Sequence, residues 1–186
     1  MKLILSFFPI IVYLICFIDL GYPASSGPVF GKNGMVVSTS RQASEAGIQI
    51  LKKGGNAVDA AVAVGFALAV TSSGNGNIGG GGFMVAAMAD GSNFTIDHRE
   101  KAPASAHRNM FINDSGNVIS GMSLSSRAAS GVPGTVDGLI KALEDYGSGK
   151  ITLRQALAPA IKLAEKGFLL THYEAQRFNN YKEFFE

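Results

Sequence analysis

The sequence predicts an α+β fold that contains a helix apolar on every side and a short β-hairpin. Residues 57–70 contain one charged side chain, Asp59, and a helix without a polar face is buried on every side. Residues 83–99 form two short segments around Asp90 and Gly91, a pair typical of a tight hairpin turn. The 186 residues, 47% hydrophobic and 16% charged, are sufficient for one sizeable core. We therefore expect a layered globular domain.

Residues 1–26 have the pattern of a secretory signal peptide. A positively charged start precedes an apolar run at residues 3–18, and the small residues Ala24 and Ser26 occupy positions −3 and −1 of a cleavage site. The run is short for a membrane span, and an uncleaved signal anchor is the alternative. The only cysteine, Cys16, lies in this segment, so the remaining chain has no disulfide, thiol nucleophile or cysteine-bound metal. These features predict a periplasmic or secreted protein.

The segment before the hairpin predicts one strand and two helices. Residues 35–38 are short and apolar, as in a buried strand. Residues 41–53 carry apolar side chains on one face and precede two glycines, a pattern typical of an amphipathic helix and its end. Asn56 then caps the buried helix, with Asp59 near its positive end.

The segment after the hairpin predicts a long loop and three helices. Residues 104–133 are rich in turn residues and form the loop. Apolar periodicity predicts helices at residues 135–146 and 153–166, and Thr171 opens the last helix. The chain ends on an aromatic, apolar stretch without a capping residue, which we interpret as an interrupted chain.

Charge and motif spacing argue against nucleic-acid, nucleotide and zinc binding. The net charge is only +2, and the basic residues are scattered. Residues 74–79 formally match the dinucleotide-binding motif, but a helix precedes them and a strand follows, which reverses the order that this motif needs. His98, His107 and His172 lack zinc-site spacing, and we expect exposed or locally hydrogen-bonded histidines. We expect no nucleic-acid partner and no metal.

The most informative stretch spans residues 76–103. Four consecutive glycines at positions 79–82 are tolerated only where the backbone comes very close to another group. Arg99 follows at the end of the hairpin, between Asp97 and Glu100. A planar guanidinium suits bidentate binding of a substrate carboxylate. The alternative is that Arg99 only pairs with one of these two acids in a solvated cluster.

Four motifs, in matching order and with similar spacing, resemble the gamma-glutamyltransferase family, and the bacterial secreted type is most similar. The resemblance covers the chain from about residue 34 onward and assigns residues 27–186 to part of the family's large subunit. The motifs are residues 54–63 (Gly-Gly-Asn-Ala-Val-Asp-Ala-Ala-Val-Ala), 76–84 (Gly-Asn-Ile-Gly-Gly-Gly-Gly-Phe-Met), 97–103 (Asp-His-Arg-Glu-Lys-Ala-Pro) and 130–135 (Ser-Gly-Val-Pro-Gly-Thr).

The resemblance implies an N-terminal-nucleophile hydrolase fold, a four-layer αββα sandwich of which this chain is an incomplete N-terminal part. Proteins of this family are made as one precursor that cuts itself into a large and a small subunit, which form a heterodimer. They remove the gamma-glutamyl group from glutathione and related compounds and pass it to water, an amino acid or a peptide, without a cofactor. Their nucleophile is the first threonine of the small subunit, so the resemblance implies no catalytic residue in this chain.

By the same resemblance, Arg99 corresponds to the arginine that binds the α-carboxylate of the gamma-glutamyl group. Asp97 and Glu100 match motif positions, and we expect them to orient Arg99 and the backbone. The glycines at positions 79–82 are expected to allow close packing of a core strand near the site, without a role as an oxyanion hole. The resemblance thus implies a substrate-binding site at Arg99, supported by Asp97 and Glu100, with no metal ligand.

Two segments need separate interpretation. Residues 71–75 replace a segment that usually contains proline in the family, which affects the expected loop but not the strand after it. Residues 171–173 resemble the family's nucleophile signature, but the residues on either side differ, and Thr171 with Glu174 forms the pattern of a capping box. We therefore expect Thr171 to be a helix cap. The alternative to a precursor fragment is a truncated, non-catalytic secreted relic or binding module that retains only the recognition half.

Overall fold

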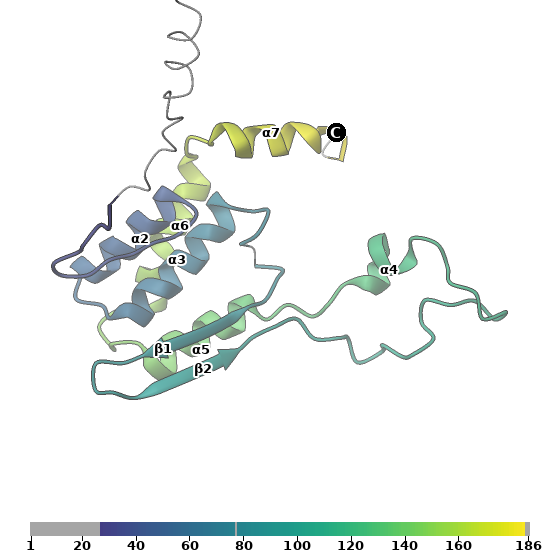
Figure 1. Ribbon diagram of the computed structural model, residues 1–186, viewed down its shortest axis with the longest axis horizontal. Helices are drawn as coiled ribbons and strands as arrows, with labels where there is room; N and C mark the ends of the chain where they lie inside the picture. Colours follow the sequence, from purple (N-terminus) through teal and green to yellow (C-terminus); the bar gives the residue numbers. More distant parts are fainter. Residues whose placement is uncertain (1–26, 77, 185–186) are drawn as a thin grey trace, which may run out of the picture. The chain divides into compact units, whose positions relative to one another are not determined.

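A computed structural model describes residues 27–76 and 78–184 (Figure 1). The chain divides into two units, residues 1–33 and residues 34–186, and every helix and strand named below belongs to the second unit. The predicted signal peptide at residues 1–26 lies outside the described residues. In the described part of the chain, no helix has the length and apolar character that crossing a membrane requires.

Helices α2 (Arg41–Lys52) and α3 (Ala57–Thr71) begin where the sequence predicts them. Ser40 caps α2, and its side-chain oxygen accepts a hydrogen bond from a backbone N–H of the first turn. Asn56 caps α3 in a reciprocal capping box with Asp59. The two helices pack against each other, and α3 is buried or half-buried along most of its length. The prediction of a buried second helix is therefore confirmed.

The predicted hairpin follows α3. Strands β1 (Phe83–Ala87) and β2 (Asn93–Asp97) pair in antiparallel orientation, with Phe83 opposite Asp97. In the turn, Gly91 has a φ of 86°, a left-handed conformation that glycine adopts without strain. A helix thus precedes the glycine run and a strand follows it, which is incompatible with the dinucleotide-binding motif.

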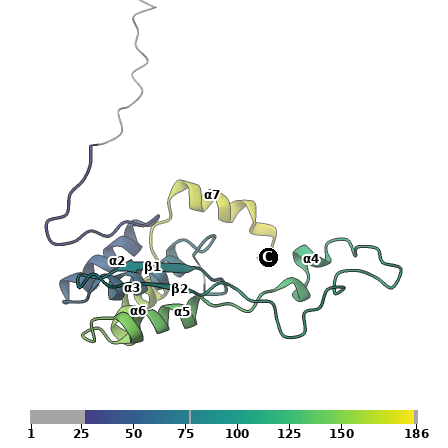
Figure 2. The ribbon, with the colours of Figure 1, turned by 60° about the horizontal axis from the view of Figure 1, so that its bottom comes forward.

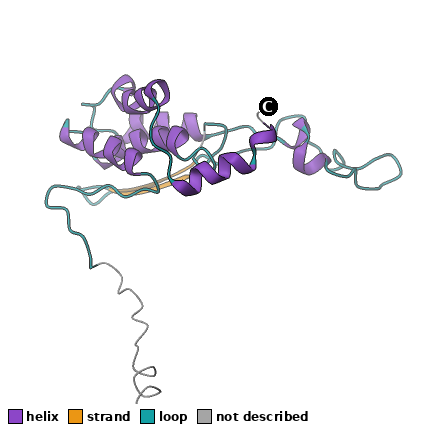
Figure 3. Ribbon diagram, turned by 90° about the horizontal axis from the view of Figure 1, so that it is seen from above, coloured by secondary structure: helices purple, strands orange, loops and turns teal. Residues whose placement is uncertain are grey.

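One face of the hairpin is covered and the other is exposed. Ile96 points to the covered face and is only 8% exposed, whereas Val85 on the other face is 81% exposed. Phe94 stacks on Tyr146 of α5 (Thr135–Tyr146), with ring centroids 3.6 Å apart and 6° between the ring planes. Figure 3 shows the hairpin edge-on, with helices on one side of it.

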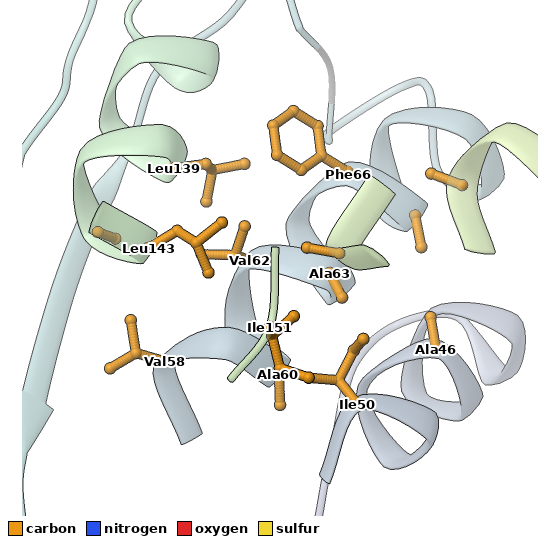
Figure 4. Close-up of a cluster of buried hydrophobic side chains, with 14 of the residues drawn as sticks. Ala46, Ile50, Val58, Ala60, Val62, Ala63, Phe66, Leu139, Leu143 and Ile151 are labelled. Carbon is orange, nitrogen blue, oxygen red and sulfur yellow. The ribbon is translucent and has the colours of Figure 1, made fainter. Parts of the chain in front are cut away.

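The core forms where α3 packs on α2, α5 and α6 (Leu153–Lys166). Helix α6 begins after Thr152, which forms a capping box with Gln155, and ends before Gly167, where φ is 74°. Both α5 and α6 have the predicted bounds. The core side chains labelled in Figure 4 are Ala46, Ile50, Val58, Ala60, Val62, Ala63, Phe66, Leu139, Leu143 and Ile151.

A long loop joins the hairpin to α5, as the sequence predicts (Figure 2). It contains two short helices, α4 (Met122–Ser125) and η1 (Arg127–Ala129). The two ends of the loop meet at an antiparallel bridge between Lys101 and Val132. The bridge brings the segment after β2 next to the segment before α5.

Thr171 caps α7 (His172–Asn180), as predicted, and a short 3-10 helix, η2 (Lys182–Phe184), follows. The Thr171 hydroxyl accepts a hydrogen bond from the Glu174 backbone N–H at 3.2 Å. The Glu174 carboxylate in turn accepts from the Thr171 hydroxyl at 2.9 Å and from its backbone N–H at 3.2 Å. The threonine that resembles a nucleophile is therefore engaged in capping the start of α7.

The expected buried strand at residues 35–38 is wrong. Among the described residues this segment pairs with no strand, and Met35 and Val37 are 49% and 82% exposed. Val36 is half-buried and packs against α2, where a Cβ at Gly47 would lie 2.9 Å from Val36 Cγ1. A short apolar run forms a strand only where a partner backbone accepts and donates its hydrogen bonds, and β1 and β2 pair with each other.

Candidate functional site

Arg99 lies two positions beyond the end of β2, at the edge where β1 begins. Its backbone N–H donates a hydrogen bond to the Asp97 carboxylate, with 3.0 Å between N and Oδ1. The Asp97 carboxylate therefore binds the backbone of this turn and not the guanidinium. This contact restrains the direction in which the chain leaves the strand.

The Arg99 side chain is held on one edge and open on the other. Its Nε donates to Glu100 Oε2 at 3.0 Å, and its Cζ lies 5.7 Å from the centroid of the Phe83 ring. The side chain is 60% exposed. Within the part of the chain that the structure describes, the two terminal Nη groups donate to no protein acceptor. A guanidinium with a free terminal edge can receive the two oxygens of a carboxylate.

Glu100 stays ionised beside Arg99 at neutral pH. Hydrogen bonding to its own backbone N–H lowers the pKa of the Glu100 carboxyl, and the Arg99 guanidinium lowers it further. The pairing of Arg99 with an acid, which the sequence left open as an alternative, is thus present, but it occupies only Nε. The carboxylate-binding role of Arg99 stays a prediction.

The predicted close approach at the glycine run is confirmed, and the neighbour is the backbone around Arg99. A Cβ on Gly81 would lie 2.6 Å from the His98 carbonyl oxygen and 2.7 Å from the Glu100 nitrogen. A Cβ on Gly134, just before α5, would clash with the same His98 carbonyl. Two glycines from distant parts of the chain therefore enclose one peptide group, which only residues without a side chain permit.

Hydrogen bonds hold this arrangement from both sides. His98 N–H donates to Gly82 O at 3.0 Å, and Gly82 N–H donates back to His98 O at 3.3 Å. Gly80 O accepts from the backbone N–H groups of Gly134 and Thr135 at 2.9 and 3.0 Å. The glycine run thus lies between the segment that carries Arg99 and the start of α5.

His98 is a residue whose environment the sequence analysis missed. Its imidazole lies between Gly82, where a Cβ would be 3.0 Å from Cε1, and Gly138 of α5, where a Cβ would clash with the His98 side chain. Nδ1 is buried and has no hydrogen-bond partner among the described residues. The expectation of an exposed or locally hydrogen-bonded histidine is therefore wrong for His98. The signal was available, since His98 continues the covered face that Phe94 and Ile96 define.

A cavity of about 470 Å³ lies elsewhere, between the segment after α3 and helix α7. Residues 71–75 form part of its wall. Arg177 faces it and lies over the Tyr173 ring, with 5.9 Å from Cζ to the ring centroid. None of Asp97, Arg99 and Glu100 lines it. This cavity and the predicted site are therefore separate.

The structure brings no group of metal ligands together in its described part. No cluster of three or more histidine, cysteine, aspartate or glutamate side chains there has the proximity that a metal ion needs. His107 and His172 are both exposed. The chemistry at this edge of the hairpin is thus that of one guanidinium, one paired carboxylate and a tightly packed backbone.

Comparison with known proteins gives a consistent result. The family model for gamma-glutamyltranspeptidase matches residues 43–186. Over 149 residues the chain is 53% identical to a glutathione hydrolase proenzyme of Pseudomonas sp. (strain A14), and over 154 residues it is 51% identical to that of Escherichia coli (strain K12). The crystal structure of Helicobacter pylori gamma-glutamyltranspeptidase superposes with a TM-score of 0.79 at 46% identity, covering 84% of this chain and 44% of that chain.

The chain belongs to the gamma-glutamyltranspeptidase family. Its helices and hairpin form part of the N-terminal-nucleophile hydrolase fold, which confirms the predicted fold class. The match to the Pseudomonas relative covers 80% of this chain but only 26% of that protein. The chain therefore spans about a quarter of the length of the curated relatives that it matches.

Proposed function

We propose that this chain is the N-terminal part of a precursor that cleaves the gamma-glutamyl amide bond of glutathione and related compounds. The gamma-glutamyl group would pass to water or to an amino acid or peptide acceptor. In this proposal residues 27–186 are a segment of the large subunit and supply substrate recognition. The two relatives named above, both called glutathione hydrolase proenzymes, support the reaction and the processing into subunits.

The observation that carries the proposal is the free terminal edge of Arg99. Glu100 binds only Nε, and the two Nη groups donate to no acceptor among the described residues. The α-carboxylate of a gamma-glutamyl group is a planar, two-oxygen anion that fits this edge in a bidentate manner. Asp97 and Glu100 would orient Arg99 through the backbone and through Nε respectively.

In this proposal the present chain binds the substrate and a second subunit carries out the chemical steps. Arg99 would hold the substrate by its carboxylate, while a threonine outside this chain attacks the gamma-carbonyl carbon. The free amine of that threonine would take the hydroxyl proton and pass it to the leaving amine as the amide bond breaks. Paired backbone N–H groups of the same second subunit would stabilise the tetrahedral intermediate. The partner is thus the small subunit from the same precursor, in a heterodimer.

The proposed location is the periplasm or the outside of the cell, without stable membrane association once the signal is cleaved. The pattern of residues 1–26 supports this. Expression of the natural precursor with its first 26 residues, followed by N-terminal sequencing of the secreted product, tests it. We expect a mature protein that begins at Gly27. An uncleaved protein that still begins at Met1 and is found in the membrane fraction would contradict the proposal.

A chimaera tests the role of Arg99. Residues 34–186 replace the corresponding segment of the Pseudomonas relative, and processing and kinetics are measured with two donors. One is the p-nitroanilide of the gamma-glutamyl group, and the other is 4-aminobutyryl p-nitroanilide, which lacks only the α-carboxylate. The discrimination ratio is defined as kcat/KM for the first donor divided by kcat/KM for the second. If Arg99 binds the α-carboxylate of the donor, a role called the carboxylate clamp below, it raises this ratio. A general structural role of Arg99 would not raise it.

Arg99→Ala should reduce the discrimination ratio at least about tenfold, because a charged hydrogen bond contributes roughly 1.5–3 kcal/mol. Arg99→Lys should give a discrimination ratio between those of the parental chimaera and Arg99→Ala, since an ammonium retains the charge without the planar fork. Arg154→Ala, at an exposed arginine of α6, is the matched control and should leave the ratio unchanged. An Arg99→Ala chimaera that processes normally and keeps the parental ratio would exclude the proposed clamp.

The second candidate is a non-catalytic relic or binding module that keeps only the recognition half. Determination of the gene sequence beyond codon 186 separates the two. An open reading frame that reaches a Thr-Thr-His segment supports the precursor, and a stop codon supports the relic. The solubility of isolated residues 27–186 gives a second test. A segment of a larger precursor leaves one hairpin face exposed and should aggregate, whereas a soluble, cooperatively folding protein would support the relic or binding module.

A further inference from the structure

The contacts around His98 extend the proposed function to a second residue. His98 and Arg99 are neighbours, and they point to opposite sides of the chain beyond β2. His98 lies on the covered side, in line with Ile96, whereas the Arg99 side chain is 60% exposed. In an extended segment the position of one side chain determines the face of the next. Whatever holds His98 in place therefore also sets the direction of Arg99.

Two glycines form the slot that holds the His98 ring. Gly82 approaches the ring at Cε1, and Gly138 approaches its other side at Cβ, Cγ and Cδ2. Gly138 is buried within α5, so the slot connects the hairpin to a core helix. Any side chain at either glycine would overlap the ring or force it to move. A flat ring fits between two backbones that approach this closely.

The ring is held by shape and not by hydrogen bonds within the described residues. Nδ1 is buried without a partner, and no hydrogen bond of the His98 side chain to another described residue is present. The backbone of His98 makes the specific contacts instead, with Gly82 on one side and the close approach of Gly81 and Gly134 on the other. The imidazole therefore acts here as a planar filler that fixes the rotation of the chain.

We propose that His98 is a positioning residue for Arg99: its ring, seated between Gly82 and Gly138, orients the guanidinium toward the substrate carboxylate. This inference rests on the proposed function of Arg99. A one-residue rotation of the segment would exchange the faces of His98 and Arg99 and would turn the guanidinium into the core. The slot prevents this rotation because only a flat ring, and not a long charged side chain, fits between the two glycines.

The test uses the same chimaera and the same discrimination ratio. His98→Ala empties the slot and should reduce the ratio by about tenfold to 100-fold, the scale that misplacement of a substrate-binding group by about 1 Å produces. His98→Phe keeps a planar ring and removes both nitrogens, so it should retain the parental ratio. If His98→Ala yields no processed protein, His98→Leu is measured instead. Its branched side chain is thicker than a flat ring and does not fit between the two glycines, so this variant should also lose discrimination.

The outcomes separate the two proposals. If Arg99→Ala lowers the ratio and the His98 variants leave it unchanged, the positioning role is excluded while the clamp stands. If Arg99→Ala itself leaves the ratio unchanged, the proposed function fails first. A His98→Phe chimaera that loses as much discrimination as His98→Ala would assign the effect to a ring nitrogen and would overturn the shape argument. Equal losses with both donors would indicate a general structural role and would also overturn it.

Discussion

The Asp59 carboxylate accepts hydrogen bonds from the backbone N–H of Ser148, at 3.2 Å to each of its oxygens, across 89 positions of sequence. The same carboxylate accepts from the Asn56 N–H at 2.8 Å and is fully buried. One side chain thus caps α3 and also fastens the turn between α5 and α6 to it. The Asn56 side chain completes the link by donating to Tyr146 O at 2.9 Å.

Replacing Asp59 should therefore destabilise the fold more than an ordinary cap change. Asp59→Ala leaves the half-buried N–H groups of Asn56 and Ser148 without this acceptor, and each loss should cost about 1 kcal/mol, at the low end of the range for buried groups. Asp59→Asn retains one carbonyl oxygen and should lose less. Chemical denaturation of the chimaera measures the free energy of unfolding. Asp114→Ala, at an exposed turn, is the control, and equal stability of the Asp59 and Asp114 variants would contradict the proposed link.

Two neighbouring glycines should respond differently to alanine. At Gly81 the added Cβ meets backbone atoms at 2.6 and 2.7 Å, whereas at Gly82 it meets the end of the His98 ring at 3.0 Å. Backbone held by hydrogen bonds cannot move aside as easily as a side chain, so Gly81→Ala should cost more stability than Gly82→Ala. Thermal unfolding midpoints give the comparison. The loss of stability caused by Gly82→Ala should be smaller in a protein that also carries His98→Ala, because the ring is then absent. Additive losses of stability in the double variant would contradict the contact between Gly82 and the His98 ring.

The pairing of Glu100 with Arg99 should be insensitive to pH above the usual glutamate range. The pKa of Glu100 is lowered from 4.5, so the carboxylate favours the folded state at neutral pH. That contribution is present above the unfolded pKa and is lost as pH falls through the lower, folded value. A carbon-13 NMR titration of the Glu100 carboxyl should therefore show a midpoint below 4.5. A midpoint above this value would show that the paired geometry does not persist in solution.

Thr171→Ala should affect helix α7 and not the reaction. Loss of an N-cap costs about 0.5–2 kcal/mol, and here it would leave the Glu174 N–H without its acceptor. Hydrogen exchange of the first-turn amides of α7 should become faster, while processing and kcat/KM of the chimaera stay near the parental values. Thr171→Ser should restore the cap. Abolished processing in Thr171→Ala would revive the nucleophile interpretation.

Several features of this protein could be predicted because they depend on residues close together in the sequence. The capping pairs Asn56 with Asp59 and Thr171 with Glu174 lie three positions apart, and the hairpin turn at Gly91 is decided by its own backbone. For the same reason, the helices at residues 135–146 and 153–166 have the expected bounds. The sequence alone also placed Arg99 at the end of the hairpin, through strand alternation.

The partners of these elements were decided only by the tertiary structure. The glycine run could be expected to approach something closely, but Gly134 and Gly138 come from a segment about 50 positions away along the chain, beyond the reach of local patterns. The expected strand at residues 35–38 failed for the same reason, since pairing depends on a partner and not on apolar composition. Asp59 could be read as a cap, but its link to Ser148 requires the turn between α5 and α6 to fold back onto α3. Local chemistry set the elements of this protein, and backbone-to-backbone packing at glycine determined what surrounds the segment that carries Arg99.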